Sequence, residues 1–102
     1  MTVACIAPRG FLPPGSLAYR TIGPFDARSL PQGLRSEHSL KQGTWALVDL
    51  SAGRLRFVWD DGQGGANDLA APATLAVPPG ITHHVEGDGP FTVAITFFRT
   101  QA

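Results

Sequence analysis

Three histidines are the side chains of this chain best suited to chemistry, and two of them are adjacent, at His83 and His84. The third is His38, and Glu86 adds a carboxylate two residues after His84. Neutral imidazoles and carboxylates bind zinc at about 2.0–2.2 Å when they converge from different strands. Iron, nickel and manganese accept similar ligand sets. The predicted ligands of a divalent metal (Zn, Fe, Ni or Mn) are therefore His38, His83, His84 and Glu86.

The two neighbouring histidines follow a turn formed by Pro78-Pro79-Gly80, in which proline fixes φ and glycine can adopt positive φ. Side chains on the following strand alternate between its two faces. His83 shares a face with apolar residues and is expected to point inward with His38, while His84 and Glu86 point away. The inverted assignment gives the set His38, His84 and Glu86. The metal-free alternative is that the histidines are structural and hydrogen-bonded to backbone carbonyls.

Aromatic side chains offer the apolar walls that a small-ligand pocket requires. Trp45, Phe57 and Phe97 are expected to fill the core or to line such a pocket, together with Trp59. Lys41 either binds an anionic group of the ligand or lies exposed. The predicted ligand-pocket residues are Lys41, Trp45, Phe57 and Phe97.

The elements that must position these residues are short strands. The chain of 102 residues suits one domain, and its 12 glycines and 9 prolines favour strands and tight turns over helices. Residues 1–15 are expected to form an irregular arm, and no helix of two turns is predicted. The predicted strands are 17–22, ended by Gly23-Pro24; 44–50 and 54–59, joined as a hairpin by Ser51-Ala52-Gly53; a strand from 69 or 73 to 77; one after the histidine turn; and 91–99, after a reversal at 87–90.

Charge and cysteine content narrow the class of protein. Eight basic and eight acidic side chains cancel, so neither nucleic acid nor a membrane surface is a predicted partner. The low charged fraction of 16% leaves room for a self-association surface, and a homodimer is expected. Cys5 is the single cysteine, which excludes an intramolecular disulfide. With neither a signal-like nor a membrane-spanning segment, the predicted location is the cytoplasm.

Two motifs carry a resemblance to a known family. The first is Pro78-x-Gly80-x-x-His83, and the second is Glu37-His38-x-x-Lys41-x-Gly43-x-Trp45. With Gly53-Arg54-Leu55-Arg56-Phe57 and the terminal Phe97-Phe98-Arg99, the chain resembles the cupin superfamily, and more narrowly the small TehB/YeaR-like cupins associated with tellurite resistance. The resemblance covers residues 12–99. It implies an all-β fold, a cupin jelly-roll (double-stranded β-helix) barrel formed by a single domain over residues 1–102.

The resemblance also implies a function. A small cupin of this kind would bind a divalent metal and a small ligand in the barrel lumen, in a tellurite or oxidative stress setting. A metal-dependent cupin dioxygenase or isomerase is one alternative, and a non-catalytic interaction module with structural histidines is another. The sequence departs from the cupin pattern at one point, because His38 stands alone where that pattern has H-x-H followed by a glutamate.

Overall fold

The computed structural model describes residues 5–87 and 89–100, and these residues form an all-β structure, as predicted. Residues 1–4 of the predicted arm and Asp88 of the predicted reversal lie outside the described residues. The elements are β1 (Cys5–Ile6), β2 (Leu17–Phe25), α1 (Gln32–Arg35), β3 (Thr44–Trp59), β4 (Ala66–Ala70), β5 (Ala73–Val77), β6 (His83–Glu86) and β7 (Phe91–Arg99).

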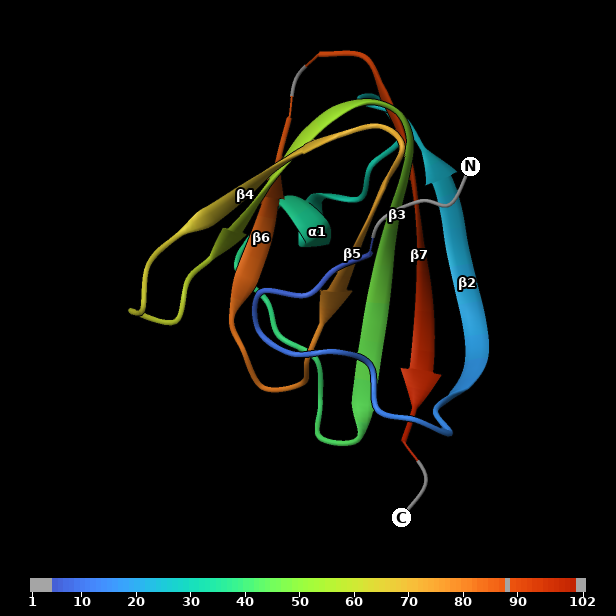
Figure 1. Cartoon of the computed structure of the whole chain (residues 1–102). Helices are drawn as coiled ribbons and strands as arrows, with labels where there is room; N and C mark the ends of the chain where they lie inside the picture. The colour runs from blue at the N-terminus through green and yellow to red at the C-terminus, as the bar shows by residue number, and fades with distance from the viewer. Residues whose placement is uncertain (1–4, 88, 101–102) are drawn as a thin grey trace.

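The strands form one sheet that branches at β3 into two leaves (Figure 1). The larger leaf has the order β1-β5-β3-β7-β2, and the smaller leaf has β4 and β6 on either side of the second half of β3. The hydrogen bonds of the described residues do not close the sheet into a barrel. In Figure 1 the two leaves face each other, with α1 drawn between β6 and β5.

The predicted hairpin at Ser51-Ala52-Gly53 is wrong, because residues 44–59 form the single strand β3. Its first half pairs with β5 and β7, and its second half pairs with β4 and β6. Gly53 has a φ of +79°, as a hairpin turn would require, but here the glycine lets the strand bend from one leaf into the other. The pairing with β7 shifts register between Leu50 and Ala52, which marks a bulge at the bend.

The bulge explains how one strand can face the core along its whole length. Before the bend the buried side chains of β3 lie at even positions, from Thr44 to Leu50, and after it they lie at odd positions, from Leu55 to Trp59. An unbroken alternation would expose one of the two sets, because the side-chain period of a strand is two. The extra residue shifts the pattern, so both halves contribute to the same core. Fully buried Leu50, Leu75, Val77 and Val93 lie at its centre.

Several other boundaries differ from those predicted. The arm contains β1, which pairs in parallel with Thr74 and Leu75 of β5. Strand β2 continues past Gly23-Pro24 to Phe25, and its pairing with β7 shifts register between Ile22 and Phe25. The corner after Leu30 forms the four-residue helix α1, and this helix, the only one in the described residues, is far too short to cross a bilayer.

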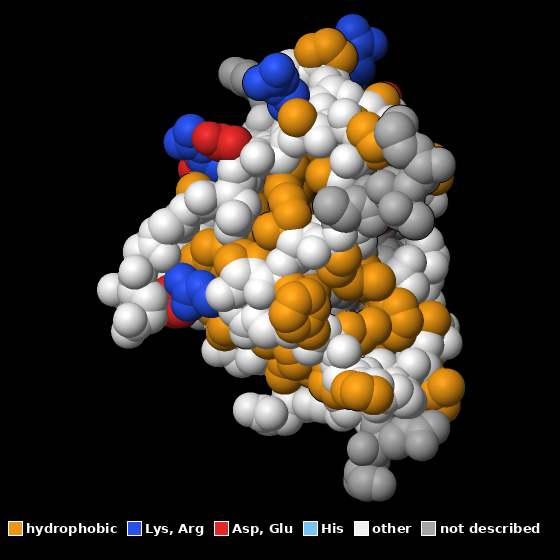
Figure 2. All heavy atoms as spheres, viewed as in Figure 1, with side chains coloured by type: hydrophobic (Ala, Val, Ile, Leu, Met, Phe, Trp, Pro, Cys, Tyr) orange, Lys and Arg blue, Asp and Glu red, His pale blue; other side chains and the backbone are white. Residues whose placement is uncertain are grey.

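The arm crosses one face of the molecule, in front of β5 and β3 in Figure 1. Gly10 of the arm lies beside Trp45, since a Cβ added to Gly10 would be 3.5 Å from the indole ring. Figure 2 shows hydrophobic side chains over the lower half of this face and Lys and Arg side chains mainly at its upper end. Phe11 of the arm remains 75% exposed.

The bend at Gly53 can be tested by adding a methyl group. A Cβ at this position would lie 2.0 Å from the carbonyl oxygen of Pro90 and 2.7 Å from Cα of Phe91, so neighbouring backbone would have to move. We expect G53A to lower the free energy of unfolding by about 1–2 kcal/mol for the left-handed backbone conformation. The steric conflict should add a further ~1–3 kcal/mol. Urea denaturation at neutral pH measures the sum.

The matched control is G62A, because Gly62 has a φ of +81° and its Cβ would meet nothing within 4 Å. This variant isolates the conformational cost. Equal losses of stability in G53A and G62A would contradict the close approach of β3 to Pro90.

Candidate histidine site

His38 and His83 lie side by side across two neighbouring segments. Their backbones exchange both hydrogen bonds of an antiparallel bridge, at 2.9 Å and 2.8 Å between nitrogen and oxygen. Residues paired in this way place their side chains on the same face. The imidazole ring centroids are accordingly 4.3 Å apart, with the rings at 69° to each other. The structure therefore brings together two histidines that are 45 positions apart in the sequence.

Backbone carbonyls fix the orientation of both rings. Nδ1 of His83 lies 2.7 Å from the carbonyl oxygen of Ile81, and Nδ1 of His38 lies 2.9 Å from that of Ser36. A carbonyl oxygen only accepts hydrogen bonds, so each Nδ1 carries the proton when its ring is neutral. Each Nε2 then has a free lone pair, and neither Nε2 has a hydrogen-bond partner among the described residues. Such carbonyl–histidine contacts are typical of ligands that bind a metal through the other nitrogen.

Aromatic rings enclose His83 on the core side. Phe57 stacks on its imidazole with a centroid distance of 4.9 Å, and Trp59, its cross-strand partner, lies 6.2 Å away. His83 is only 3% exposed, whereas His38 is partly exposed. Burial lowers the pKa of His83 from 6.5 to about 4, against a smaller opposing effect of the Ile81 carbonyl. His83 is therefore neutral at physiological pH, the form that can donate a lone pair.

His84 points to the opposite face of β6 and is held between two carboxylates. Its Nε2 lies 2.7 Å from Glu86, and its Nδ1 lies 2.6 Å from Asp60. Both contacts are satisfied at once only when the ring carries two N–H groups, which makes it an imidazolium. Glu86, and then Asp60, accordingly raise the pKa of His84 above its ordinary value.

The four predicted metal ligands thus separate into two pairs. His38 and His83 share one face, while His84 and Glu86 share the other, and His84 has no nitrogen left to bind a metal. The inverted set of His38, His84 and Glu86 is not assembled. Within residues 5–87 and 89–100, no three His, Cys, Asp or Glu side chains lie close enough together to hold a metal ion. The arrangement offers two nitrogen ligands, and any further ligands would have to come from water or a bound molecule.

The four predicted ligand-pocket residues also fall in different places. Phe57 packs against His83 at the histidine site. Lys41 and Phe97 line a separate hollow of about 350 Å³ near β2. Trp45 is half-buried, on the face of β3 opposite to the core residues Thr44 and Ala46, beside the N-terminal arm. Only Phe57 therefore contacts a histidine of the pair.

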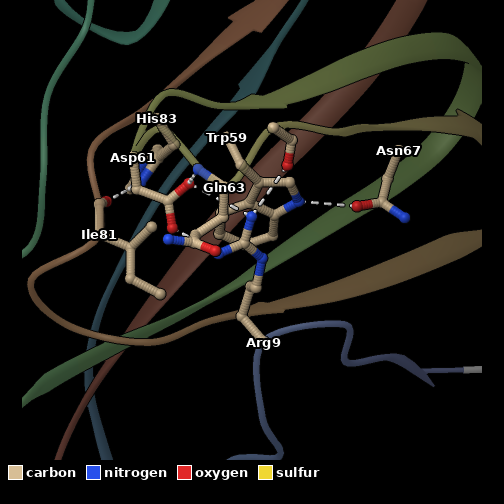
Figure 3. Close-up of polar contacts among 8 residues, drawn as sticks. Arg9, Trp59, Asp61, Gln63, Asn67, Ile81 and His83 are labelled. Carbon is tan, nitrogen blue, oxygen red and sulfur yellow. Dashed lines mark hydrogen bonds and ion pairs between the residues drawn. The ribbon is translucent and has the colours of Figure 1, made fainter.

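The sequence did not predict a contact between the N-terminal arm and Trp59, an aromatic neighbour of His83. Arg9 of the arm forms a close ion pair with Asp61, donates a hydrogen bond of 3.0 Å to the carbonyl oxygen of Gly64, and lies 5.0 Å above the ring of Trp59 (Figure 3). The indole Nε1 of Trp59 in turn donates to Asn67 at 2.8 Å. The pairing with Arg9 lowers the pKa of Asp61. The one hint in the sequence is that Arg9 is the single charged residue of the first 15.

A sequence profile described as the TehB-like domain matches residues 20–95, which include both histidines of the pair. The chain belongs to the TehB-like family. No curated protein matches the sequence.

Two solved structures share the fold of this TehB-like chain. TehB from Haemophilus influenzae is 21% identical with a TM-score of 0.75, over 83% of this chain and 32% of TehB. A protein of Escherichia coli strain K12 is 17% identical with a TM-score of 0.77, over 90% of this chain and 98% of that protein. The TehB-like chain therefore spans about a third of the length of Haemophilus TehB and almost the whole of the Escherichia protein.

The pKa of His84 gives the TehB-like chain a specific pH dependence. Because the folded pKa is raised above about 6.5, its stabilising contribution is fully present below that pH and is lost as pH rises through the folded pKa. E86Q removes the largest cause of the shift. We expect the difference in free energy of unfolding between the parent chain and E86Q to be greatest at pH 6 and to shrink towards pH 9. Urea denaturation with EDTA present measures it.

The control is D68N, which removes a carboxylate that pairs with Arg56 instead of a histidine. The pKa of Asp68 is lowered by that pairing, so its contribution does not change between pH 6 and 9. If E86Q and D68N showed the same pH profile, the carboxylate–imidazole contact would not carry the effect.

Proposed function

We propose that this TehB-like chain binds a divalent metal through Nε2 of His38 and His83, and that a small ligand binds beside it. One observation carries the proposal: the imidazoles of His38 and His83 have the same hydrogen-bonding state. Both donate Nδ1–H to a backbone carbonyl, and both leave Nε2 without a partner among the described residues. No buried side-chain nitrogen among the described residues lacks a hydrogen-bond partner, so both Nε2 atoms reach the solvent, where a metal ion could approach them.

The surroundings of the rings favour ligation. His83 stays neutral because it is buried, and the backbone bridge limits the relative movement of the two side chains. Zn, Fe, Ni or Mn would fit two imidazole ligands and would supply a Lewis acid that polarises a bound oxygen atom. Phe57 and Trp59 would exclude water on the core side, and partly exposed His38 would mark the side open to a ligand.

Binding is preferred over oxygenase chemistry because of the ligand count. A two-histidine, one-carboxylate set is the usual iron site of such oxygenases. Glu86 lies on the opposite face, bonded to His84, so it does not supply that carboxylate. A metal-dependent dioxygenase or isomerase stays the second candidate, and substrate-dependent oxygen uptake by the iron-loaded chain would favour it.

Membership of the TehB-like family supports proposals about the fold and the biological context of this chain. We infer that the two leaves correspond to the halves of a cupin jelly-roll, with the fold likeness to Haemophilus TehB as support. A tellurite or oxidative stress response is the proposed context, since the chain belongs to the TehB-like family. A homodimer and a cytoplasmic location stay predictions.

Metal binding can be tested directly on untagged protein. We expect isothermal titration with Zn²⁺ to give one equivalent per chain. H38A and H83A should each weaken binding by about 10- to 100-fold or more. Substitution of a residue that only supports a metal ligand already has an effect of this size. H84Q is the matched control, because both nitrogens of His84 are occupied by carboxylates, and it should bind like the parent chain. Equal losses in all three variants would contradict the proposed ligands.

A bound metal should also stabilise the fold. We expect saturating Zn²⁺ to raise the calorimetric unfolding temperature, because a ligand that binds only the folded state adds its binding free energy to stability. The shift should disappear with excess EDTA and in the double variant H38A/H83A. Indistinguishable transitions with and without Zn²⁺ would count against a metal at this site.

A further inference from the structure

A second hollow lies between the edge strand β2 and the segment that leads into β3, next to the buried residue Thr44. Its volume is about 350 Å³, within the usual range of small-molecule sites. The hollow is distinct from the histidine pair, because none of the residues that line it is a histidine. The lining residues that matter here are Tyr19, Arg20, Ser39, Lys41, Thr44 and Phe97.

A bulge in β2 accounts for two neighbouring residues facing one hollow. Ala18 pairs with Phe98 and Arg20 pairs with Phe97, so Tyr19 is an extra residue in the ladder. Along a regular strand Tyr19 and Arg20 would point to opposite faces, whereas a bulge re-aims a side chain. Both residues line the hollow. Bulges of this kind are common next to binding sites.

The hollow has aromatic walls. The rings of Tyr19 and Phe97 lie with centroids 6.5 Å apart at an angle of 35°. The guanidinium of Arg99 lies 4.5 Å above the ring of Tyr19. Tyr19 is 43% exposed, so its ring is accessible to a ligand in the hollow. The walls suit a flat apolar body.

The charge of the hollow has one sign. Arg20 and Lys41 line it and no carboxylate does. Neither residue, nor Arg99, forms a salt bridge with any described residue. Buried Thr44 adds a hydroxyl that makes no side-chain hydrogen bond within the described part of the chain. Two cations and unused donors in one hollow suit a small anion.

A larger hollow of about 850 Å³ near the bend of β3 does not carry the same argument. Its lining includes Asp68 and Glu86 as well as arginines. Arg56 is already paired with Asp68, and Arg35 donates to the carbonyl oxygens of Gly87 and Ala27. Two of the three arginines that line this hollow are thus occupied by the protein itself, and Arg54 is the third.

We propose that the smaller hollow binds a small aromatic carboxylate. The carboxylate is held by Arg20 and Lys41 and receives a hydrogen bond from Thr44, and the ring lies against Tyr19 and Phe97. This site is independent of the proposed metal site.

Benzoate is the probe, with benzamide as its uncharged analogue and acetate as its ringless one. In a titration of the ¹⁵N-labelled full chain at 150 mM NaCl, benzoate should shift the amide signals of Tyr19, Arg20, Lys41 and Phe97. The shifts should saturate with a Kd below about 1 mM. Benzamide and acetate should each bind at least about tenfold more weakly, a difference of ~1.4 kcal/mol. Acetate as tight as benzoate, or shifts spread over the whole surface, would overturn the proposal.

Substitution of the two cations that line the hollow tests where benzoate binds. R20M and K41M should each weaken benzoate binding about five- to tenfold, less than a buried charge-assisted hydrogen bond would give, because both side chains are exposed. R28M is the matched control, because Arg28 is an exposed cation in a turn outside the hollow. R28M should bind benzoate like the parent chain. An equal loss of affinity in this variant would show that only the net charge of the protein matters, which would contradict the proposed site. H83A should retain benzoate binding, which separates failure here from failure of the metal proposal.

Discussion

The structure depends on the passage of one strand between two leaves. β3 carries the hydrogen bonds of both leaves, and at Gly53 its backbone passes so close to Pro90 that a single added carbon would collide. The bulge beside this point moves the buried side chains from even to odd positions. Without that shift Leu55, Phe57 and Trp59 would face solvent. A conformational requirement at one glycine thus decides whether the second half of the core exists.

The histidine site is a result of the same bend. The second half of β3 pairs with β6, and this pairing sets Trp59 opposite His83. The backbone bridge between His83 and His38 then adds a third segment beside these two strands. His83 is therefore buried because the strand beside it has turned inward. The neighbouring His84 faces the other way and has the opposite electrostatic environment, with carboxylates in place of aromatic rings.

The sequence predicted the local features well and the long-range ones poorly. Alternation in 91–99 identified the buried face of β7, and the turn at Gly80 was correctly read from its neighbours, since its φ is +79°. A glycine between two β-rich runs fits a hairpin turn as well as a bend, so the sequence predicts a hairpin at Gly53 where the strand in fact bends. Only the strand partners distinguish the two structures, and pairing is not a local property. The contact of Arg9 with Asp61 joins residues 52 positions apart, which no spacing rule predicts.

The N-terminal arm is attached to the rest of the molecule at two points. It is tied to the larger leaf through β1 and to the loop after β3 through Arg9. The side chains of Arg9 and Asp61 are each only 20% exposed, and sheltered charges of this kind are screened weakly by dissolved salt. Changes in ionic strength should therefore leave the pair of Arg9 and Asp61, and with it the attachment of the arm, intact.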